Sequence, residues 1–65
     1  PEDASEKLCE LLSDESVQVR KNTSLALMKM EAEEAIRPLK NAAAIEKDEQ
    51  VKSVMNVAIK VLEQD

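Results

Sequence analysis

DEQVKSVMNVAIKVL, residues 48–62, is the stretch that decides the fold. Its apolar residues recur at spacings of three and four, which places them on one face of an α-helix. Asp48 stands directly before the pattern and is a favoured N-cap residue. We therefore predict an amphipathic helix that begins after Asp48. Its apolar face comprises Val51, Val54, Met55, Ala58, Ile59 and Leu62.

The same design occurs 32 residues earlier, in SVQVRKNTSLALMKM at residues 16–30. Ser16 falls on Asp48 in this alignment, so the two predicted N-caps coincide. We predict a helix over about 17–30, with a buried stripe of Val19, Thr23, Ala26, Leu27 and Met30. An internal repeat of this length is typical of solenoids, in which each unit is a small supersecondary structure.

Two further helices complete the repeats. One is expected over Ala4–Leu12, with Asp3 as N-cap and Glu6 as its capping-box partner. The other is expected from Glu34 or Ala35 to Ile45, with Ile36, Leu39 and Ala43 on its apolar face. Pro38 fits this helix if Glu34 is the N-cap, because N–H groups of the first turn lack helical partners.

The expected fold is therefore all-α: an α-α superhelix of four helices, arranged as two antiparallel helical hairpins. Strand signals are weak, and good helix formers dominate the composition. We expect one domain over residues 1–65, with a first repeat at about 3–30 and a second at about 33–64.

Composition narrows the functional classes. The chain has no histidine, no aromatic residue and one cysteine, so an internal disulfide and a structural zinc site are excluded. A net charge of −5 disfavours nucleic-acid binding, which depends on basic residues neutralising phosphates. No apolar run approaches a membrane span, and no signal-peptide pattern stands out, so we expect no membrane association and a cytoplasmic location.

Small size makes support from outside the chain important. A chain of 65 residues buries only ~60% of its unfolded surface, and its stability is marginal. The sequence starts at Pro1 rather than at methionine, so we expect processing or a longer parent chain. Association with another protein, with further repeats of the parent chain or with a second copy is the expected support.

The repeat units resemble a known family. The segments Val19-Arg20-Lys21, Ala26-Leu27-Met28-Lys29-Met30 and Glu34–Leu39 are similar to HEAT-like repeats, specifically the short type found in phycocyanobilin lyases. This resemblance implies an armadillo-like, right-handed stack of helix pairs whose usual role is protein recognition. The family commonly has Gly-Asp where this chain has Glu31-Ala32. Because the left-handed C-cap is costly without glycine, we expect a tighter turn or more continuous helices there.

The resemblance also implies ion pairs between repeats, because the base after the valine often pairs with an acid of a neighbouring repeat. The bases are Arg20 and Lys52, and the candidate acids are Asp14 and Glu46. We interpret these as structural pairs of small net value rather than as a ligand site.

Reactive chemistry is not expected. Cys9 lacks a histidine to activate it and is interpreted as a half-buried small hydrophobe. The acidic residues near the two turns fit no calcium loop and are interpreted as caps and first-turn acids. They are Asp14, Glu15, Glu46, Asp48 and Glu49. We predict a protein that is not an enzyme and has no catalytic, cofactor or metal site.

Apolar residues off the main stripes point to a partner. An apolar arc wider than one packing face indicates burial on a second side, although scattered surface valines are common. The candidate partner surface comprises Val17, Leu25, Met28, Val54, Val57 and Val61. We predict a protein-binding scaffold module that uses the surface of the second and fourth helices, or an uncapped terminal helix. The alternatives are a nucleic-acid-binding solenoid and a non-catalytic accessory subunit of a lyase-type enzyme.

Overall fold

The computed structural model describes residues 4–64, which form four α-helices, two short 3₁₀ helices and no strand. The predicted all-α class with four packed helices is confirmed. The α-helices are α1 (Ala4–Glu10), α2 (Val17–Lys29), α3 (Ile36–Ile45) and α4 (Glu49–Glu63), and the 3₁₀ helices are Leu11–Ser13 and Glu33–Ala35. No helix within residues 4–64 is both long and apolar enough to cross a membrane.

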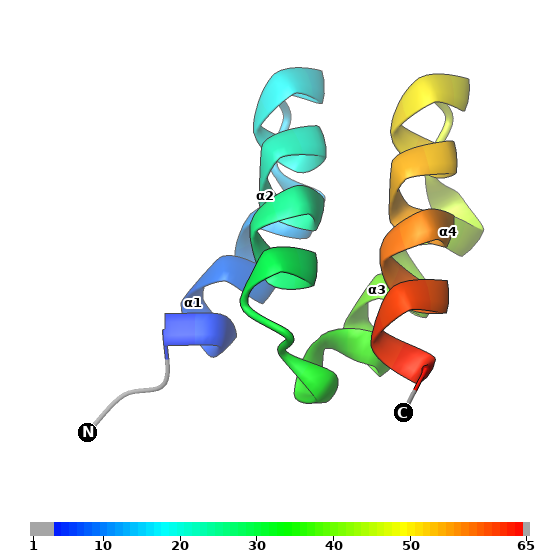
Figure 1. The fold of residues 1–65 in the computed structure, drawn as a ribbon. Coiled ribbons are helices and arrows are strands. Elements are labelled where there is room, and N and C mark those ends of the chain that lie inside the picture. Colours follow the sequence, from blue (N-terminus) through cyan, green and yellow to red (C-terminus); the bar gives the residue numbers. More distant parts are fainter. Residues whose placement is uncertain (1–3, 65) are drawn as a thin grey trace.

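The helices form two hairpins that lie next to each other. α2 and α4 run side by side in the same direction, and α3 lies behind α4 (Figure 1). α1 and the 3₁₀ helix Leu11–Ser13 pack on α2. The most extensive contacts join α2 to α4 and α3 to α4, so α4 is the central element of the packing.

Side-chain caps fix where α2 and α4 begin. Ser16 Oγ accepts a hydrogen bond from the backbone N–H of Val19 at 3.2 Å, and Asp48 Oδ1 accepts one from Val51 N–H at 3.0 Å. Both cap residues have extended backbone, as an N-cap requires. The two predicted N-caps are confirmed. Asp3, the predicted N-cap of α1, lies outside the described residues.

The predicted bounds of α1 and α3 need correction. α1 ends at Glu10, and the chain tightens into the 3₁₀ helix that includes Leu12. α3 begins at Ile36 with Ala35 at the cap position, so Glu34 is not its N-cap. Pro38 is the third residue of α3. Proline has no backbone N–H, and a residue in the first turn does not need one for a helical hydrogen bond. Pro38 therefore costs α3 no hydrogen bond.

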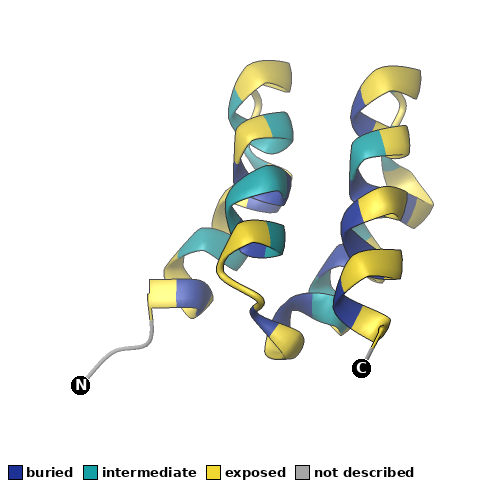
Figure 2. Cartoon of the chain, in the orientation of Figure 1, coloured by how far each residue is buried: buried dark blue, intermediate teal, exposed yellow. Residues whose placement is uncertain are grey.

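The core is centred on α4. Val51, Met55 and Ala58 are fully buried, and the predicted α4 face is confirmed except for Val54, which is half-buried. Leu12, Leu27, Leu39 and other apolar residues of both hairpins join them in one cluster. The pattern of burial along the helices is shown in Figure 2.

The predicted buried stripe of α2 is partly wrong. Met30 is 46% exposed, and Val19 and Ala26 are only half-buried, whereas Ser24 is fully buried. Ser24 can be buried because its Oγ donates to the carbonyl of Arg20 at 3.0 Å, which satisfies the hydroxyl within the helix. The buried face of α2 is therefore rotated toward Ser24 and includes Thr23 and Leu27.

The turn after α2 keeps the geometry that usually requires glycine. Glu31 has a φ of 55°, its N–H donates to Met28 O at 3.0 Å, and Ala32 N–H donates to Leu27 O at 3.2 Å. This pair of bonds is the Schellman motif, with Glu31 at the left-handed position and buried Ala32 following it. The expectation of a tighter turn or more continuous helices is therefore wrong.

Replacing Glu31 with glycine is expected to stabilise the chain by about 1 kcal/mol, because the left-handed conformation costs a residue with a Cβ roughly that much. The measurement is urea unfolding followed by far-ultraviolet circular dichroism, since the chain has no aromatic reporter. Glu31→Ala is the control. It removes the same carboxylate but keeps a Cβ, so a gain as large as that of glycine would contradict the argument.

Candidate functional site

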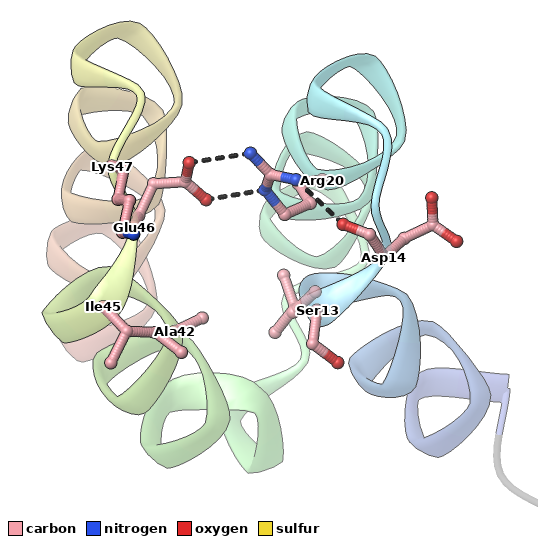
Figure 3. Close-up of a pocket in the computed structure, with 8 residues that line it drawn as sticks. Ser13, Asp14, Arg20, Ala42, Ile45, Glu46 and Lys47 are labelled. Atoms are coloured by element: carbon pink, nitrogen blue, oxygen red, sulfur yellow. Dashed lines mark hydrogen bonds and ion pairs between the residues drawn. The ribbon is translucent and has the colours of Figure 1, made fainter.

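A bidentate ion pair joins the two hairpins. Arg20, in the first turn of α2, faces Glu46, which follows α3 (Figure 3). Arg20 Nε lies 2.8 Å from Glu46 Oε1, and Nη2 lies 2.9 Å from Oε2. The side chains are 18% and 3% exposed, respectively. This is a bidentate, charge-assisted pair, the geometry that gives arginine–carboxylate contacts their directionality.

Backbone groups complete the same network. Arg20 Nη1 donates to the carbonyls of Asp14 at 2.8 Å and Glu15 at 3.1 Å, and Asp48 N–H donates to Glu46 Oε2 at 3.0 Å. The hydrogen bond from Arg20 is the main reason that the pKa of Glu46 lies below its ordinary value, although burial opposes the shift. The hydrogen bond to Glu46 likewise raises the pKa of Arg20. The network ties the turn of one hairpin to the turn of the other.

The four residues predicted for inter-repeat ion pairs have different positions. Arg20 and Glu46 form the ion pair described above. Asp14 contributes its carbonyl to Arg20, while its carboxylate accepts from the N–H of Ser16 at 2.9 Å. Lys52 is exposed on α4. The structure therefore brings three of these residues together and leaves Lys52 outside the network.

A hollow of about 260 Å³ opens beside the pair and is lined by both hairpins. Figure 3 shows Asp14 and Arg20 on one side and Ala42 and Ile45 on the other. Four of the five guanidinium N–H groups of Arg20 already have acceptors, so little capacity remains for an anionic ligand.

The candidate partner surface separates into exposed and half-buried residues. Val17, Val57 and Val61 are 45%, 54% and 42% exposed, whereas Leu25 and Met28 are half-buried. Met28 packs against the core, which removes it from an open surface. Val57 and Val61 are four residues apart on α4 and share one helical face. This pair, with half-buried Val54 beside it, is the exposed apolar strip of α4.

The structure also exposes apolar residues that the sequence pattern did not single out as surface. They are Leu11 at 40%, Met30 at 46% and Ile45 at 75%. Leu11 and Met30 belong to regular helical spacing, so sequence alone could not separate them from the core. Ser5, 1% exposed, donates to Glu34 Oε2 at 2.6 Å and links α1 to the start of the second hairpin. No sequence signal marked this contact.

Cys9 and three of the acidic residues make contacts that the structure defines. Cys9 is half-buried and packs against the core, as a small hydrophobe does. The carboxylates of Asp14, Glu46 and Asp48 each accept a backbone N–H at a turn or helix start. Within residues 4–64, no group of three or more potential metal ligands lies together.

The comparisons with known proteins found a relative of this chain. No protein-family model matches the chain, and no solved structure matches it. The chain is similar to the bilin biosynthesis protein MpeU of Synechococcus sp. (strain WH8020), with 54% identity over 57 residues. The match covers 88% of this chain and 19% of that protein. The chain is thus homologous to a segment that makes up about a fifth of a bilin biosynthesis protein.

Proposed function

We propose that this chain is a HEAT-like, two-hairpin module of a bilin biosynthesis protein, and that it binds a protein partner without supplying a reacting group. The observation that carries the proposal is the 54% identity to a segment of MpeU, a bilin biosynthesis protein. This similarity favours the lyase-type accessory role over the nucleic-acid alternative. Arg20, which a basic groove would need, is already engaged by Glu46.

The exposed apolar strip of α4 is the proposed contact. Val57 and Val61 present branched aliphatic side chains to solvent on the most central helix of the fold. Burying them against a partner would remove apolar area from water, which is the main favourable term in protein association. Because α4 packs against both α2 and α3, the strip would meet its partner with little ordering cost.

The proposal also assigns no catalytic step to this chain. The sequence has no histidine, and its one cysteine is half-buried against the core. Arg20 and Glu46 form an ion pair and neutralise each other. Their role is to hold the hairpins in register, and through them the strip on α4.

A segment exchange tests the proposal. In MpeU, the matched segment is replaced by this chain, and bilin formation is measured by absorption in cells that lack the native protein. We expect the chimera to restore bilin formation. The double variant Val57→Asp/Val61→Asp places two charges in the contact. It is expected to weaken the affinity for the partner about tenfold or more, a loss of roughly 1.4 kcal/mol in binding free energy, and to lower the yield of bilin accordingly.

Matched variants distinguish loss of the exposed apolar strip of α4 from the effect of added negative charge elsewhere on the helix. Ser53→Asp/Asn56→Asp adds the same charge at exposed positions of α4 and is expected to keep the yield. Cys9→Ser should also keep it, because no covalent role is assigned to the thiol. Failure of the unmutated chimera would reject the link to bilin biosynthesis. A folded, fully active Val57→Asp/Val61→Asp chimera would reject the strip as the contact.

A further inference from the structure

Charge is distributed unevenly between the helices of this acidic chain. α2 and α4, which lie side by side in Figure 1, carry five bases and two acids between them. The rest of the sequence carries four bases and twelve acids. The two acids of α4, Glu49 and Glu63, are its first and last residues. The net charge of −5 therefore conceals a pair of helices that is positive along most of its length.

The side of this helix pair that carries the exposed apolar strip of α4 also carries bases on α2. Lys21, Leu25 and Lys29 recur at a spacing of four and share one face of α2. A shift of 32 residues places Leu25 on Val57 and Lys29 on Val61. Because α2 and α4 run side by side in the same direction, corresponding positions face the same side of the pair (Figure 1). Lysines of α2 therefore border the strip on α4.

A third lysine adjoins the strip on α4 itself, since Lys60 follows Val57 by three residues. Each residue of this surface is exposed or half-buried. Within residues 4–64, the ion pairs leave out Lys21, Lys29 and Lys60, so their charges are available to a partner. We call the whole surface the basic apolar face, and it comprises Lys21, Leu25, Lys29, Val54, Val57, Lys60 and Val61.

The acids nearest to the basic apolar face stand at its two ends. Glu31 follows α2, and with Glu33 and Val61 it lines a hollow of about 370 Å³ at the end of α4. Glu49 begins α4 at the opposite end. Between these ends, residues 16–30 and 50–62 contain no aspartate or glutamate. An acidic partner that lies along the face would therefore meet no repelling carboxylate over most of its length.

The shape of this surface favours a helix as the partner. Side-chain ridges on two neighbouring helices can receive a third helix, whose apolar residues then recur at spacings of three and four. An extended peptide would need a free strand edge, and residues 4–64 contain no strand. Carboxylates beside the apolar stripe of such a helix would complement the lysines, and complementary charges favour the correct partner and orient it.

We propose that the basic apolar face binds an acidic amphipathic helix of the partner protein. The apolar stripe of that helix packs on the exposed apolar strip of α4 and on Leu25. Its carboxylates pair with Lys21, Lys29 and Lys60. This inference rests on the proposed function, which assigns the strip to a protein contact, and it adds the chemistry of the partner. Anionic membranes and nucleic acids also attract lysines, and the experiments below distinguish these occupants from an acidic helix.

The first experiment measures the affinity of the whole chain for two synthetic peptides by fluorescence anisotropy. Both peptides are amphipathic helices with the same stripe of leucines, and they differ only in the flanking residues, which are glutamates in one and lysines in the other. We expect the acidic peptide to bind about tenfold more tightly or better. The difference should shrink at about 1 M salt, where the Debye length is only ~3 Å. Equal affinities at low salt would overturn the proposal.

Substitution of the three lysines tests whether they are the source of this preference. Lys21→Gln/Lys29→Gln/Lys60→Gln should weaken binding of the acidic peptide about tenfold, because each exposed ion pair contributes little alone but three act together. Binding of the basic peptide should not weaken. Circular dichroism checks that the variant keeps its helices.

A second triple variant is the matched control. Lys40→Gln/Lys47→Gln/Lys52→Gln removes the same charge from lysines outside the basic apolar face, so the affinity for the acidic peptide should change less than about twofold. Equal losses for the two triple variants would mean that net charge, rather than this face, attracts the peptide, and the proposal would be overturned.

The MpeU chimera separates this inference from the proposed function. The variant Lys21→Gln/Lys29→Gln/Lys60→Gln should lower bilin formation severalfold, as the Val57→Asp/Val61→Asp variant does. Full activity of the lysine variant beside loss in the valine variant would overturn the acidic partner and leave the proposed function standing. An inactive unmutated chimera would reject the proposed function, whereas the peptide affinities would still decide the chemistry of the face.

Two further probes cover the other anionic occupants. Vesicles of anionic phospholipid and a DNA duplex are each titrated with the whole chain and with the variant Lys21→Gln/Lys29→Gln/Lys60→Gln. We expect weaker binding to both probes than to the acidic peptide. Tighter binding to either probe that depends on the three lysines would overturn the proposal, because a membrane or a nucleic acid would then be the occupant.

Discussion

Replacement of Leu27 by alanine is expected to leave much of the chain unfolded at room temperature. Leu27 is fully buried and belongs to the cluster that includes residues of both hairpins. A buried Leu→Ala change costs about 2–5 kcal/mol, through lost transfer energy and the cavity left behind. At ~0.05–0.15 kcal/mol per residue, a chain of this size has a total stability of only roughly 3–10 kcal/mol. A loss of this size is comparable to the total stability toward the lower end of that range, where so small a domain is expected to lie.

Leu11→Ala is the matched control for Leu27→Ala, since the chemical change is the same. Leu11 is 40% exposed, so its truncation leaves no closed cavity and should cost less than about 1 kcal/mol. Urea titration by circular dichroism, with the helical signal in water as the starting point, measures both variants. Equal losses for the two variants would show that Leu27 does not hold the hairpins together.

Replacement of Glu46 by glutamine is expected to lower the melting temperature by on the order of 5 °C at neutral pH. Glutamine keeps the shape of the side chain but has one acceptor oxygen and one donor group. It can accept only one of the two guanidinium bonds, and its amide would face the other N–H group. The charge of Arg20, only 18% exposed, would lose its counterion.

The same comparison has a defined pH dependence. The pKa of Glu46 is lowered in the folded chain, chiefly by the hydrogen bond from Arg20. A lowered carboxyl pKa contributes stability above the unfolded-state pKa of about 4.3, and this contribution is lost as the pH falls through the folded-state pKa. The difference in melting temperature between the wild type and Glu46→Gln should therefore be constant near neutrality and shrink under acid conditions.

Glu63→Gln is the control, because it breaks an ion pair that is exposed to solvent. Glu63 pairs with Lys40 at 2.7 Å, but their side chains are 45% and 56% exposed. Exposed pairs typically contribute about 0–1 kcal/mol, so this variant should melt within a few degrees of the wild type. A Glu46→Gln difference that persisted unchanged in acid, or a Glu63→Gln loss of equal size, would contradict the role assigned to the buried pair.

Local chemistry in the sequence was sufficient to predict several elements. Ser16 and Asp48 are short polar residues directly before apolar periodicity, and their oxygens cap α2 and α4 as expected. The face of α4 could be predicted because α4 packs on two neighbours through one wide apolar arc. The similarity of residues 16–30 to 48–62 predicted that two helices each begin after a polar cap, as α2 and α4 do.

Burial within α2 could not be predicted in the same way. Each of its apolar residues fits helical spacing, and whether it is buried depends on where the neighbouring hairpin lies. Ser24 is buried although it is polar, while Met30 remains 46% exposed. Periodicity identifies a face, but only packing decides which part of a broad face is covered.

The sequence by itself determined four helices, the polar caps of α2 and α4 and a repeated design, because these depend on contacts within a few residues. Tertiary structure alone decided that Glu31 adopts a left-handed backbone, that Ser5 meets Glu34, and that Arg20 pairs with Glu46 rather than with the carboxylate of Asp14. The physical reason is that a strained turn or a bidentate ion pair is stable only when packing elsewhere brings its parts together and limits the alternatives.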